Sequence, residues 1–249
     1  MLAAERQAKI VEIVRRQGSV QVEDLAQSLR VSTMTIRRDL EKLQEDDLLE
    51  RCHGGAVAKQ EVTYADKSTS HKSEKKKLAA ACRALVTAGD NIYLDAGTTT
   101  YEIAKAIQDI PDIMVVTNDL EIAGLLKNSQ AELFLCGGMV QKSTGSVLGY
   151  YATQMLRDFR FDVGFFGAAS INSDLEVMTP TVEKAFLKRE AQSKCQKAYL
   201  VVDESKYGKQ AMTKINHLSD YTAVITTKAL TPEEKDKADS SGVRIIPVY

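Results

Sequence analysis

Three consecutive threonines follow an Asp-Ala-Gly turn in residues 95–100, and this spacing predicts an anion-binding site. An apolar, strand-like run precedes the turn at Asn91–Leu94, and a helical pattern begins near Tyr101. Hydroxyl groups and free backbone amides at the start of a helix attract anions, because the helix dipole places partial positive charge there. No nucleotide or dinucleotide phosphate motif accompanies the turn, so a single phosphate on a small molecule fits better. The simpler alternative is that the threonines only cap the helix.

Polar residues also follow the other predicted strands, where ligands bind in open α/β sheets. Lys206 could supply a point charge to a phosphate, and glycines at such a rim allow close approach of the backbone to a ligand, unless they are only turn residues. The residues expected at this rim are Asp95, Gly97, Thr98, Thr99, Thr100, Thr117, Asn118, Gly137, Gly138, Asp203 and Lys206.

A second candidate site lies in residues 31–40, VSTMTIRRDL, where Arg37 and Arg38 are adjacent. Ser32 is a favourable helix N-cap. The apolar residues Ile36, Leu40 and Leu43 recur with helical spacing and form one buried stripe. The side facing away from the stripe carries Met34, Thr35, Arg38 and Lys42, with Arg37 on its flank. This pattern predicts a short helix with a cationic, hydroxyl-bearing front.

The elements around these residues fall into two patterns. Up to about Ala58, the sequence predicts three helices and a hairpin around Gly54-Gly55. The second and third helices are separated only by Arg30 to Ser32, which is typical of a helix-turn-helix that enters a DNA major groove, with the hairpin as a wing. The simpler alternative is that the arginines are solvated surface charges paired with Asp39 or Glu41 and bind no DNA. Net charge does not decide between them, because acidic residues outnumber basic ones by one up to Val57.

Beyond Leu78, strand-like runs alternate with helical patterns, which predicts a largely parallel α/β sheet. The expected strands are Asn91–Leu94, Ile113–Val116, Leu133–Leu135, Val163–Phe166, Tyr199–Val202, Ala223–Ile225 and Arg244–Val248. The expected helices are Leu78–Val86, Tyr101–Ile107, Leu120–Leu126, Val182–Gln196 and Glu233–Ala238.

The N-terminal residues resemble the DNA-binding signature of the DeoR family of bacterial repressors. The resemblance is carried by TIRRDL at residues 35–40 and by HGGA at residues 53–56. The family usually has glycine in the turn entering the wing, where this chain has Asp47. The resemblance implies that Asp39 orients an arginine and that the DNA-facing residues are Ser32, Thr33, Thr35, Arg37, Arg38, Lys42, Arg51 and His53.

The rest of the chain resembles the effector domain of the same family. The matching segments are DAGTTT, TND, CGG, FDVGFFGAAS, the glutamate at Glu183 and DESKYG. The resemblance implies a domain with the fold of ribose-5-phosphate isomerase that binds phosphorylated sugars or polyols, and it adds Glu183 to the effector-binding residues. The family commonly has a glycine after INSD, where this chain has Leu175-Glu176.

Three segments are therefore expected in the chain. Residues 1–57 form a winged helix-turn-helix domain, residues 58–77 a polar linker, and residues 78–249 an α/β effector domain. The linker ends in KSTSHKSEKKK, lacks hydrophobic periodicity and contains more basic than acidic residues. A flexible hinge with incidental DNA affinity and a merely solvated linker are both compatible with this composition.

Composition excludes several other classes. No apolar run approaches the roughly 18 residues of a membrane span, and the charged N-terminus is not a signal peptide. The cysteines Cys52, Cys82, Cys136 and Cys195 are isolated, which favours a reducing cytoplasm and argues against a metal site. We expect neither a metal nor a cofactor.

The function that these observations predict is transcriptional regulation. The chain would be a repressor of a carbohydrate operon that binds double-stranded operator DNA, as a homodimer or homotetramer, and responds to a phosphorylated sugar or polyol. The alternative from another class is a sugar-phosphate isomerase carrying a DNA-binding module. Isomerisation needs a general base, which Asp95, Glu183 or Asp203 could provide, but the isomerase's paired carboxylates are replaced by Gly167-Ala168-Ala169-Ser170. An architectural DNA binder without a ligand would not explain the polar rim.

Overall fold

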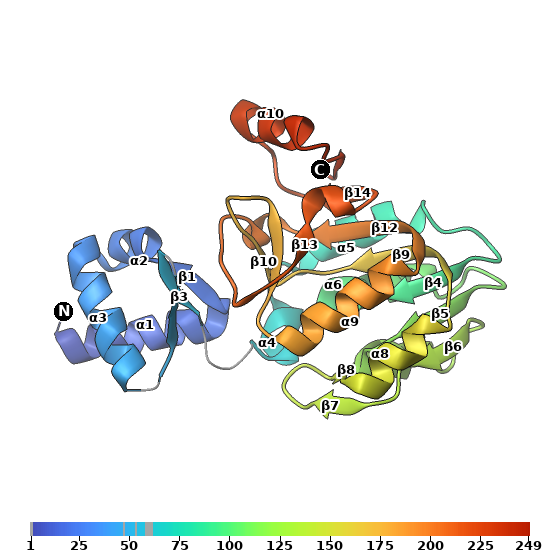
Figure 1. Ribbon diagram of the computed structural model, residues 1–249, viewed down its shortest axis with the longest axis horizontal. Coiled ribbons are helices and arrows are strands. Elements are labelled where there is room, and N and C mark those ends of the chain that lie inside the picture. The colour runs from blue at the N-terminus through green and yellow to red at the C-terminus, as the bar shows by residue number, and fades with distance from the viewer. Residues whose placement is uncertain (1, 47, 53, 58–61) are drawn as a thin grey trace.

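The helix-turn-helix expected near the N-terminus is present in the computed structural model, which describes residues 2–46, 48–52, 54–57 and 62–249. It contains α1 (Ala3–Gln17), α2 (Val22–Leu29) and α3 (Thr33–Glu45) (Figure 1). Arg30 adopts a left-handed conformation with φ of 55° in the turn between α2 and α3. The Ser32 hydroxyl then accepts a hydrogen bond from the Thr35 amide at 3.2 Å, so the predicted N-cap is confirmed.

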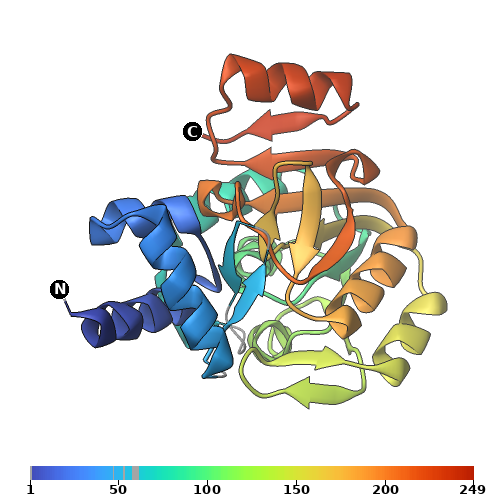
Figure 2. The ribbon, with the colours of Figure 1, turned by 60° about the vertical axis from the view of Figure 1, so that its left-hand side comes forward.

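The wing is a small antiparallel sheet of β1 (Ser19–Gln21), β3 (Gly55–Val57) and β2 (Glu50–Cys52), in that order. Gly55 is required by packing, because a Cβ atom there would lie 2.0 Å from the Val20 carbonyl oxygen. Asp47 and His53, which the sequence places at the wing, lie outside the described residues. The core of this unit is formed by side chains from all three helices, among them Ile10, Leu25, Ile36 and Leu40. Figure 2 shows the small sheet beside the larger unit.

Two helices occupy most of the segment expected to be a polar linker. These are α4 (Tyr64–Thr69) and α5 (Lys72–Arg83), so the predicted boundary at residue 78 falls inside a helix. The buried face of α5 is formed by Leu78, Ala79 and Cys82 and extends back one turn to Lys75. A lysine can occupy such a position because its aliphatic stem packs as an apolar group. Because Lys75 is charged, the sequence pattern predicted a helix that begins only at Leu78. Linker residues 58–61 lie outside the described part of the chain.

The larger unit is built on a seven-stranded parallel sheet. Its order is β15-β14-β12-β9-β4-β5-β6. The strands are β4 (Asn91–Leu94), β5 (Met114–Thr117), β6 (Glu132–Leu135), β9 (Phe161–Phe166), β12 (Cys195–Val202), β14 (Ala223–Thr226) and β15 (Ile245–Pro247). All seven predicted strands are confirmed, with boundaries that differ by a few residues.

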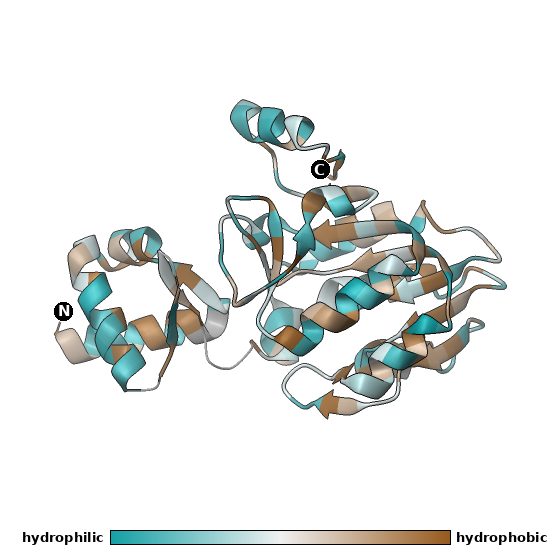
Figure 3. Ribbon diagram, viewed as in Figure 1, coloured by the Kyte–Doolittle hydropathy of each residue, from teal (hydrophilic) through white to brown (hydrophobic). Residues whose placement is uncertain are grey.

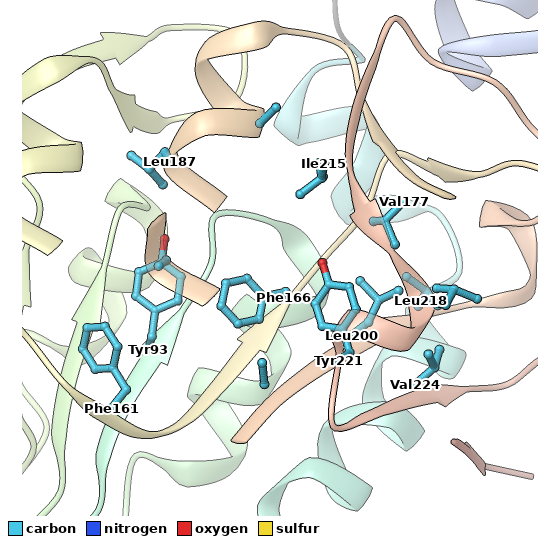
Figure 4. Packing of buried hydrophobic residues seen from close by; sticks show 14 of the residues in the cluster. Tyr93, Phe161, Phe166, Val177, Leu187, Leu200, Ile215, Leu218, Tyr221 and Val224 are labelled. Atoms are coloured by element: carbon cyan, nitrogen blue, oxygen red, sulfur yellow. The ribbon is translucent and has the colours of Figure 1, made fainter. Parts of the chain in front are cut away.

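Helices cover both faces of this sheet. One face carries α5, α6 (Thr98–Ile107) and α7 (Leu120–Leu126), and the other carries α8 (Tyr150–Arg157) and α9 (Val182–Ser193). Side chains alternate along β12, so that Leu200 packs under α8 and α9 and Val201 under α5 and α6. Hydropathy follows the same layering, with apolar strands inside and polar outer faces of helices (Figure 3). Aromatic rings fill the layer under α9, where Tyr93, Phe161 and Phe166 lie together (Figure 4).

The predicted helix Val182–Gln196 was too long, because α9 ends at Ser193 and β12 begins at Cys195. The first residues of β12 include exposed Gln196 and Lys197, which carry no strand-like apolar signal. Smaller elements were not predicted at all. They are α8, the hairpin of β7 (Met139–Gln141) and β8 (Ser146–Leu148), the antiparallel strands β10 (Ser170–Ile171), β11 (Glu176–Thr179) and β13 (Thr213–His217), and the 3-10 turns η1 (Glu204–Lys206) and η2 (Leu218–Asp220). The expected helix Glu233–Ala238 is present as α10 (Pro232–Ser240).

The order of the sheet places a crevice between β4 and β9. From β4 the chain continues to β5 and β6 on one side, and from β9 it continues to β12, β14 and β15 on the other. Loops that leave neighbouring parallel strands in opposite directions separate at the carboxyl ends of those strands, where open α/β sheets bind ligands. The loop after β4 is the DAGTTT segment.

Candidate functional site

The exposed face of α3 is cationic. Arg37, Arg38 and Lys42 are exposed, and the neighbouring Met34 is 63% exposed. In the part of the chain that the structure describes, no carboxylate lies within ion-pair distance of Arg37 or Arg38. Neither arginine is therefore paired with Asp39 or Glu41, and the front of the helix is free to contact a polyanion.

Asp39 does orient an arginine, but one from α1. Its carboxylate is buried and accepts hydrogen bonds from Arg6 Nε at 2.5 Å and from Gln7 Nε2 at 3.0 Å. This pair ties α1 to α3 and fixes the tilt of the recognition helix. Arg51 of the wing pairs with Glu41 at 2.9 Å, which places it beside α3. The Ser32 and Thr35 hydroxyl oxygens lie 2.9 Å apart at the start of α3, and Thr33 is exposed there.

A cavity of about 1920 Å³ lies between the two units. Its inner part is lined by the ends of β4 and β9 and by the start of α6, and its outer wall includes Lys9, Glu12 and Gln17 of α1. Small-molecule sites usually enclose about 300–1,000 Å³. A ligand the size of a sugar phosphate would therefore fill only the inner part and leave the remainder as a cleft toward the N-terminal unit.

The start of α6 is shaped by two buried residues that follow β5. Asn118 Oδ1 accepts a hydrogen bond from the Ala96 amide at 3.0 Å, and Asp119 Oδ2 accepts one from the Gly97 amide at 2.9 Å. Burial raises the pKa of Asp119 to about 6, against the opposing effect of the backbone amides that it accepts from. These contacts hold the turn and occupy the amides of Ala96 and Gly97. The amides that follow in the chain remain available.

The amides of Thr98, Thr99 and Thr100 form the first turn of α6, where helix geometry provides no acceptor. The Thr100 hydroxyl donates to the Gly97 carbonyl at 2.8 Å, within the first turn of the helix. The hydroxyls of Thr98 and Thr99 make no hydrogen bond to another described residue, and both side chains line the cavity. The N-cap residue is Gly97 and no side chain caps α6, so capping does not account for the three threonines.

Two lysines share this cavity with the start of α6. Burial and then the Lys206 ammonium lower the pKa of Lys75 to about 8, although Asp203 and Glu102 oppose the shift. Burial also lowers the pKa of Lys206, against the effect of Asp203. Burial alone would raise the pKa of Asp203, but Lys206 and the Ser205 hydroxyl hold it below its usual value. The inner cavity therefore has an excess of positive charge.

Asp95 lies at the crevice between β4 and β9, and its carboxylate is already engaged. It forms a buried ion pair with Lys188 of α9 and accepts the Gly167 amide at 3.0 Å, while Lys188 Nζ also donates to the Gly167 carbonyl at 3.0 Å. The pair bridges β4, α9 and the loop after β9. It lines the cavity and can offer polar atoms to a ligand, but it has no unpaired carboxylate to act as a base.

Seven of the twelve effector residues predicted from the sequence line the cavity: Asp95, Gly97, Thr98, Thr99, Thr100, Asn118 and Lys206.

The other five do not, for separate physical reasons. The Thr117 hydroxyl donates to the Leu94 carbonyl inside the sheet, and Gly138 packs where a Cβ atom would lie 2.4 Å from the Leu148 carbonyl oxygen. Gly137 precedes it in the same turn, Glu183 is exposed on α9, and the Asp203 carboxylate accepts a hydrogen bond from the Ser205 amide at 2.9 Å.

Several cavity residues were missed by the sequence prediction. Lys75 was counted within the linker, and Lys184 and Lys188 lie on the buried face of α9. One signal could have found Lys75, because it lies three residues before Leu78 and four before Ala79 on the apolar stripe. Nothing in the local pattern of α9 distinguishes buried lysines from solvated ones.

No metal centre is found: the described residues contain no group of three or more His, Cys, Asp or Glu side chains placed to hold an ion. Within the same described ranges, no helix has both the length and the apolar character needed to cross a bilayer.

A winged helix-turn-helix joined to an α/β unit with a cationic cavity defines the class of ligand-responsive transcription regulators. Residues 6–62 match the DeoR-like helix-turn-helix domain, and residues 70–228 match the DeoR C terminal sensor domain. The chain belongs to the DeoR family.

Relatives along nearly the whole chain carry regulator names. An uncharacterized HTH-type transcriptional regulator of Haemophilus influenzae is 35% identical, over 100% of this chain and 98% of its own length. The glycerol-3-phosphate regulon repressor of Escherichia coli K12 is 31% identical, over 91% of both chains. The lactose phosphotransferase system repressor of Streptococcus mutans is 32% identical, over 91% of this chain and 92% of its own.

Solved structures with a related arrangement include two of other function. Ribose 5-phosphate isomerase A from Methanocaldococcus jannaschii is 17% identical, covers 55% of each chain and has a TM-score of 0.42. The translation initiation factor eIF-2B from Pyrococcus horikoshii is 14% identical, covers 90% of this chain and 89% of its own, and has a TM-score of 0.47.

Proposed function

We propose that the protein is a transcriptional repressor whose affinity for operator DNA is controlled by a phosphorylated sugar or polyol. One observation carries the ligand class: the free amides and two unbonded threonine hydroxyls of α6 share a cavity with Lys75 and Lys206. Amides at a helix start and two ammonium groups favour a compact dianion such as a phosphate. The relatives named for a glycerol-3-phosphate regulon and a lactose phosphotransferase system are consistent with this ligand class.

Binding without turnover suits this cavity better than catalysis. An isomerase would need a general base beside the carbon-bound proton of the substrate. Asp95 is committed to Lys188 and Gly167, Asp203 does not line the cavity, and Glu183 is exposed away from it. The full-length relatives named as regulators support the same reading. Incubating the protein with sugar phosphates and finding aldose–ketose interconversion would establish the enzyme alternative.

Thermal-shift measurements with a panel of phosphorylated sugars and polyols, each paired with its unphosphorylated form, test the ligand class. We expect only phosphorylated compounds to raise the melting temperature, because a ligand that binds the folded state alone stabilises it. Equal shifts from both members of each pair would refute the phosphate assignment. The panel also identifies the compound for the release experiment.

Removal of the phosphate contacts should separate DNA binding from release. Thr98→Val with Thr99→Val deletes two hydroxyls with little change in shape, and Lys206→Met removes a charge. We expect these variants to bind operator as the wild type does and to remain bound at effector concentrations that release the wild type. Lys197→Met, an exposed lysine at the far end of β12, is the matched control and should release normally. A wild-type release midpoint in the triple variant would place the phosphate elsewhere.

A further inference from the structure

Lys75 is a buried lysine that pairs with no acidic residue in the part of the chain that the structure describes. It is 4% exposed, and its Nζ donates to two backbone carbonyls, Lys67 O at 2.5 Å and Ser70 O at 2.7 Å. Over the ranges that the structure describes, no carboxylate lies within ion-pair distance of it. Buried charges are ordinarily paired, and an ammonium has three N–H donors. Among the described residues, one donor of Lys75 is therefore unused and its charge has no carboxylate in direct contact.

The groups around Lys75 do not supply the missing charge. Lys206 and Lys67 repel it, whereas Asp203 and Glu102 attract it from a greater distance than an ion pair allows. Lys75 and Lys206 line the same inner cavity as the start of α6. An anion placed there would relieve the repulsion between the two ammonium groups and meet the free α6 amides at the same time.

The carbonyls that Lys75 holds belong to the end of α4, the helix that connects the two units. No residue of α4 is buried, so few apolar contacts fasten it. Its first residue is held by a hydrogen bond from the Tyr64 amide to the Ser143 carbonyl at 2.9 Å and by an edge contact between the Tyr64 and Tyr101 rings. Its last turn is held by Lys75. Apart from the hydrogen bond from Gln21 Nε2 to the Gly208 carbonyl at 3.2 Å, the N-terminal unit is therefore positioned through a helix whose end is fastened by an ammonium inside the ligand cavity.

We infer that the Lys75 ammonium is shared between the effector phosphate and α4, so that phosphate binding weakens its hydrogen bonds to Lys67 and Ser70 and loosens the connecting helix. This inference rests on the proposed phosphate site. The bonds from Nζ to the two carbonyls have an ionised donor and a neutral acceptor, whereas a phosphate adds an ionised acceptor and the Coulomb attraction between opposite charges. The phosphate therefore draws Nζ toward itself and away from the two carbonyls. The loosened α4 lets the N-terminal unit leave the orientation in which α3 meets its half-site. Effector binding thus acts on DNA binding through one side chain.

Amide hydrogen exchange of the full-length protein, with inorganic phosphate as the probe and chloride at equal ionic strength as the blank, tests the inference. In the wild type, phosphate should slow exchange at residues 98–100 and accelerate it at residues 66–71. In Lys75→Met, exchange at residues 66–71 should already be fast without phosphate, and phosphate should not accelerate it. Phosphate affinity should fall by about tenfold or more, the loss of one charge-assisted hydrogen bond.

Two further variants separate the role of the charge from that of the fold. Lys76→Met removes an exposed lysine next to Lys75 and should behave as the wild type. Lys75→Arg keeps the charge and should retain the acceleration at residues 66–71. Slowing at residues 98–100 without any change at residues 66–71 in the wild type would overturn the inference and leave the proposed function standing. Unaltered phosphate affinity in Lys75→Met would also overturn it. No slowing at residues 98–100 in the wild type would refute the phosphate site and the inference together.

Discussion

Arg37 and Arg38 present the chemistry that DNA recognition requires, because both are exposed on the front of α3 and neither pairs with a carboxylate among the described residues. If either side chain reads a guanine edge, its replacement by alanine should cost about 1–3 kcal/mol of operator binding and relax the sequence preference at that position. If it contacts only a phosphate, binding should weaken equally on all sequences, and the slope of log affinity against log salt should fall by about one.

Binding isotherms on operator and on scrambled DNA at several salt concentrations distinguish these outcomes. Arg244→Ala, an exposed arginine at the far edge of the large sheet, is the matched control and should bind as the wild type does. Unchanged operator affinity in the double variant Arg37→Ala/Arg38→Ala would show that α3 is not the recognition helix.

Lys75 also makes anion binding pH-dependent in a defined direction. Its pKa is lowered to about 8 in the free protein, and a bound anion favours the charged form and raises that pKa. Anion affinity is therefore highest where Lys75 is protonated in the free protein, below about pH 8. It declines as the pH rises past that value, because Lys75 of the free protein then loses its proton. Sulfate is a suitable probe, because its charge is constant over neutral and alkaline pH.

Sulfate affinity by calorimetry should fall between about pH 7 and about pH 9 in the wild type. The groups facing Lys75 are Lys206, Asp203, Glu102 and Lys67, and Lys206 contributes a decline of its own. In Lys75→Met, sulfate affinity should therefore still decline with pH, but less steeply than in the wild type. An identical profile in the variant would show that Lys75 does not meet the anion.

At the residue scale, the sequence predicted the site where the chemistry is local. Ser32, Thr98 and Thr99 could be placed because capping and helix starts depend on neighbouring residues. Lys188 could not, because its partner Asp95 lies in the loop after β4, 93 residues away in the sequence. Lys75 was overlooked within a run of similar lysines, where only burial sets one apart from the rest.

At the scale of elements, the wing depends on a glycine that has no room for a side chain. Gly55→Ala would place a methyl group 2.0 Å from the Val20 carbonyl oxygen, so β3 must move away from β1. We expect a loss of about 1–3 kcal/mol in the stability of the N-terminal unit, the usual cost of overpacking, with weaker operator binding. Urea unfolding followed by far-UV circular dichroism measures the loss.

Gly124→Ala provides the contrasting control. Gly124 lies inside α7, has open space around its Cβ position and does not adopt a positive φ. Alanine there should stabilise the protein by about 0.5–1 kcal/mol, because it restricts the unfolded chain and favours helix. Equal stability of the Gly55→Ala variant and the wild type would mean that the wing relaxes without cost.

The elements that the sequence predicted correctly are those with a strong apolar period. The inner strands β4, β5, β9, β12 and β14 are largely buried on both faces and contain apolar runs, whereas the edge strands β6 and β15 are only partly buried. The short strands β7, β8, β10 and β11 are two to four residues long and are set by their antiparallel partners rather than by their own pattern. The helix α4 and the first half of α5, residues 72–77, were assigned to a linker because polar residues dominate both segments.

For the whole molecule, reading two half-sites requires two copies of the recognition helix, and one surface of the large unit offers a place for association. Tyr150 and Tyr151 on α8 are 71% and 76% exposed, and Phe186 on the neighbouring α9 is 58% exposed. The two helices are joined by an ion pair between Arg157 and Glu190 at 3.7 Å. We expect this face to bury against a second copy, because exposed aromatic side chains gathered on adjacent helices are typical of interfaces.

Tyr151→Asp with Phe186→Asp places two charges on that face and should prevent association without touching the core, because both side chains are exposed. Sedimentation should show a dimer or larger assembly for the wild type and a monomer for the variant. Affinity for a full operator should fall in the variant, whereas affinity for a single half-site should not change, since α3 is unaltered. Tyr249→Asp, at a tyrosine that is 86% exposed near the C-terminal edge of the sheet, is the control and should associate normally. An assembly of wild-type mass in the double variant would move the interface to another face, and a monomeric wild type on a full operator would contradict the two-copy arrangement itself.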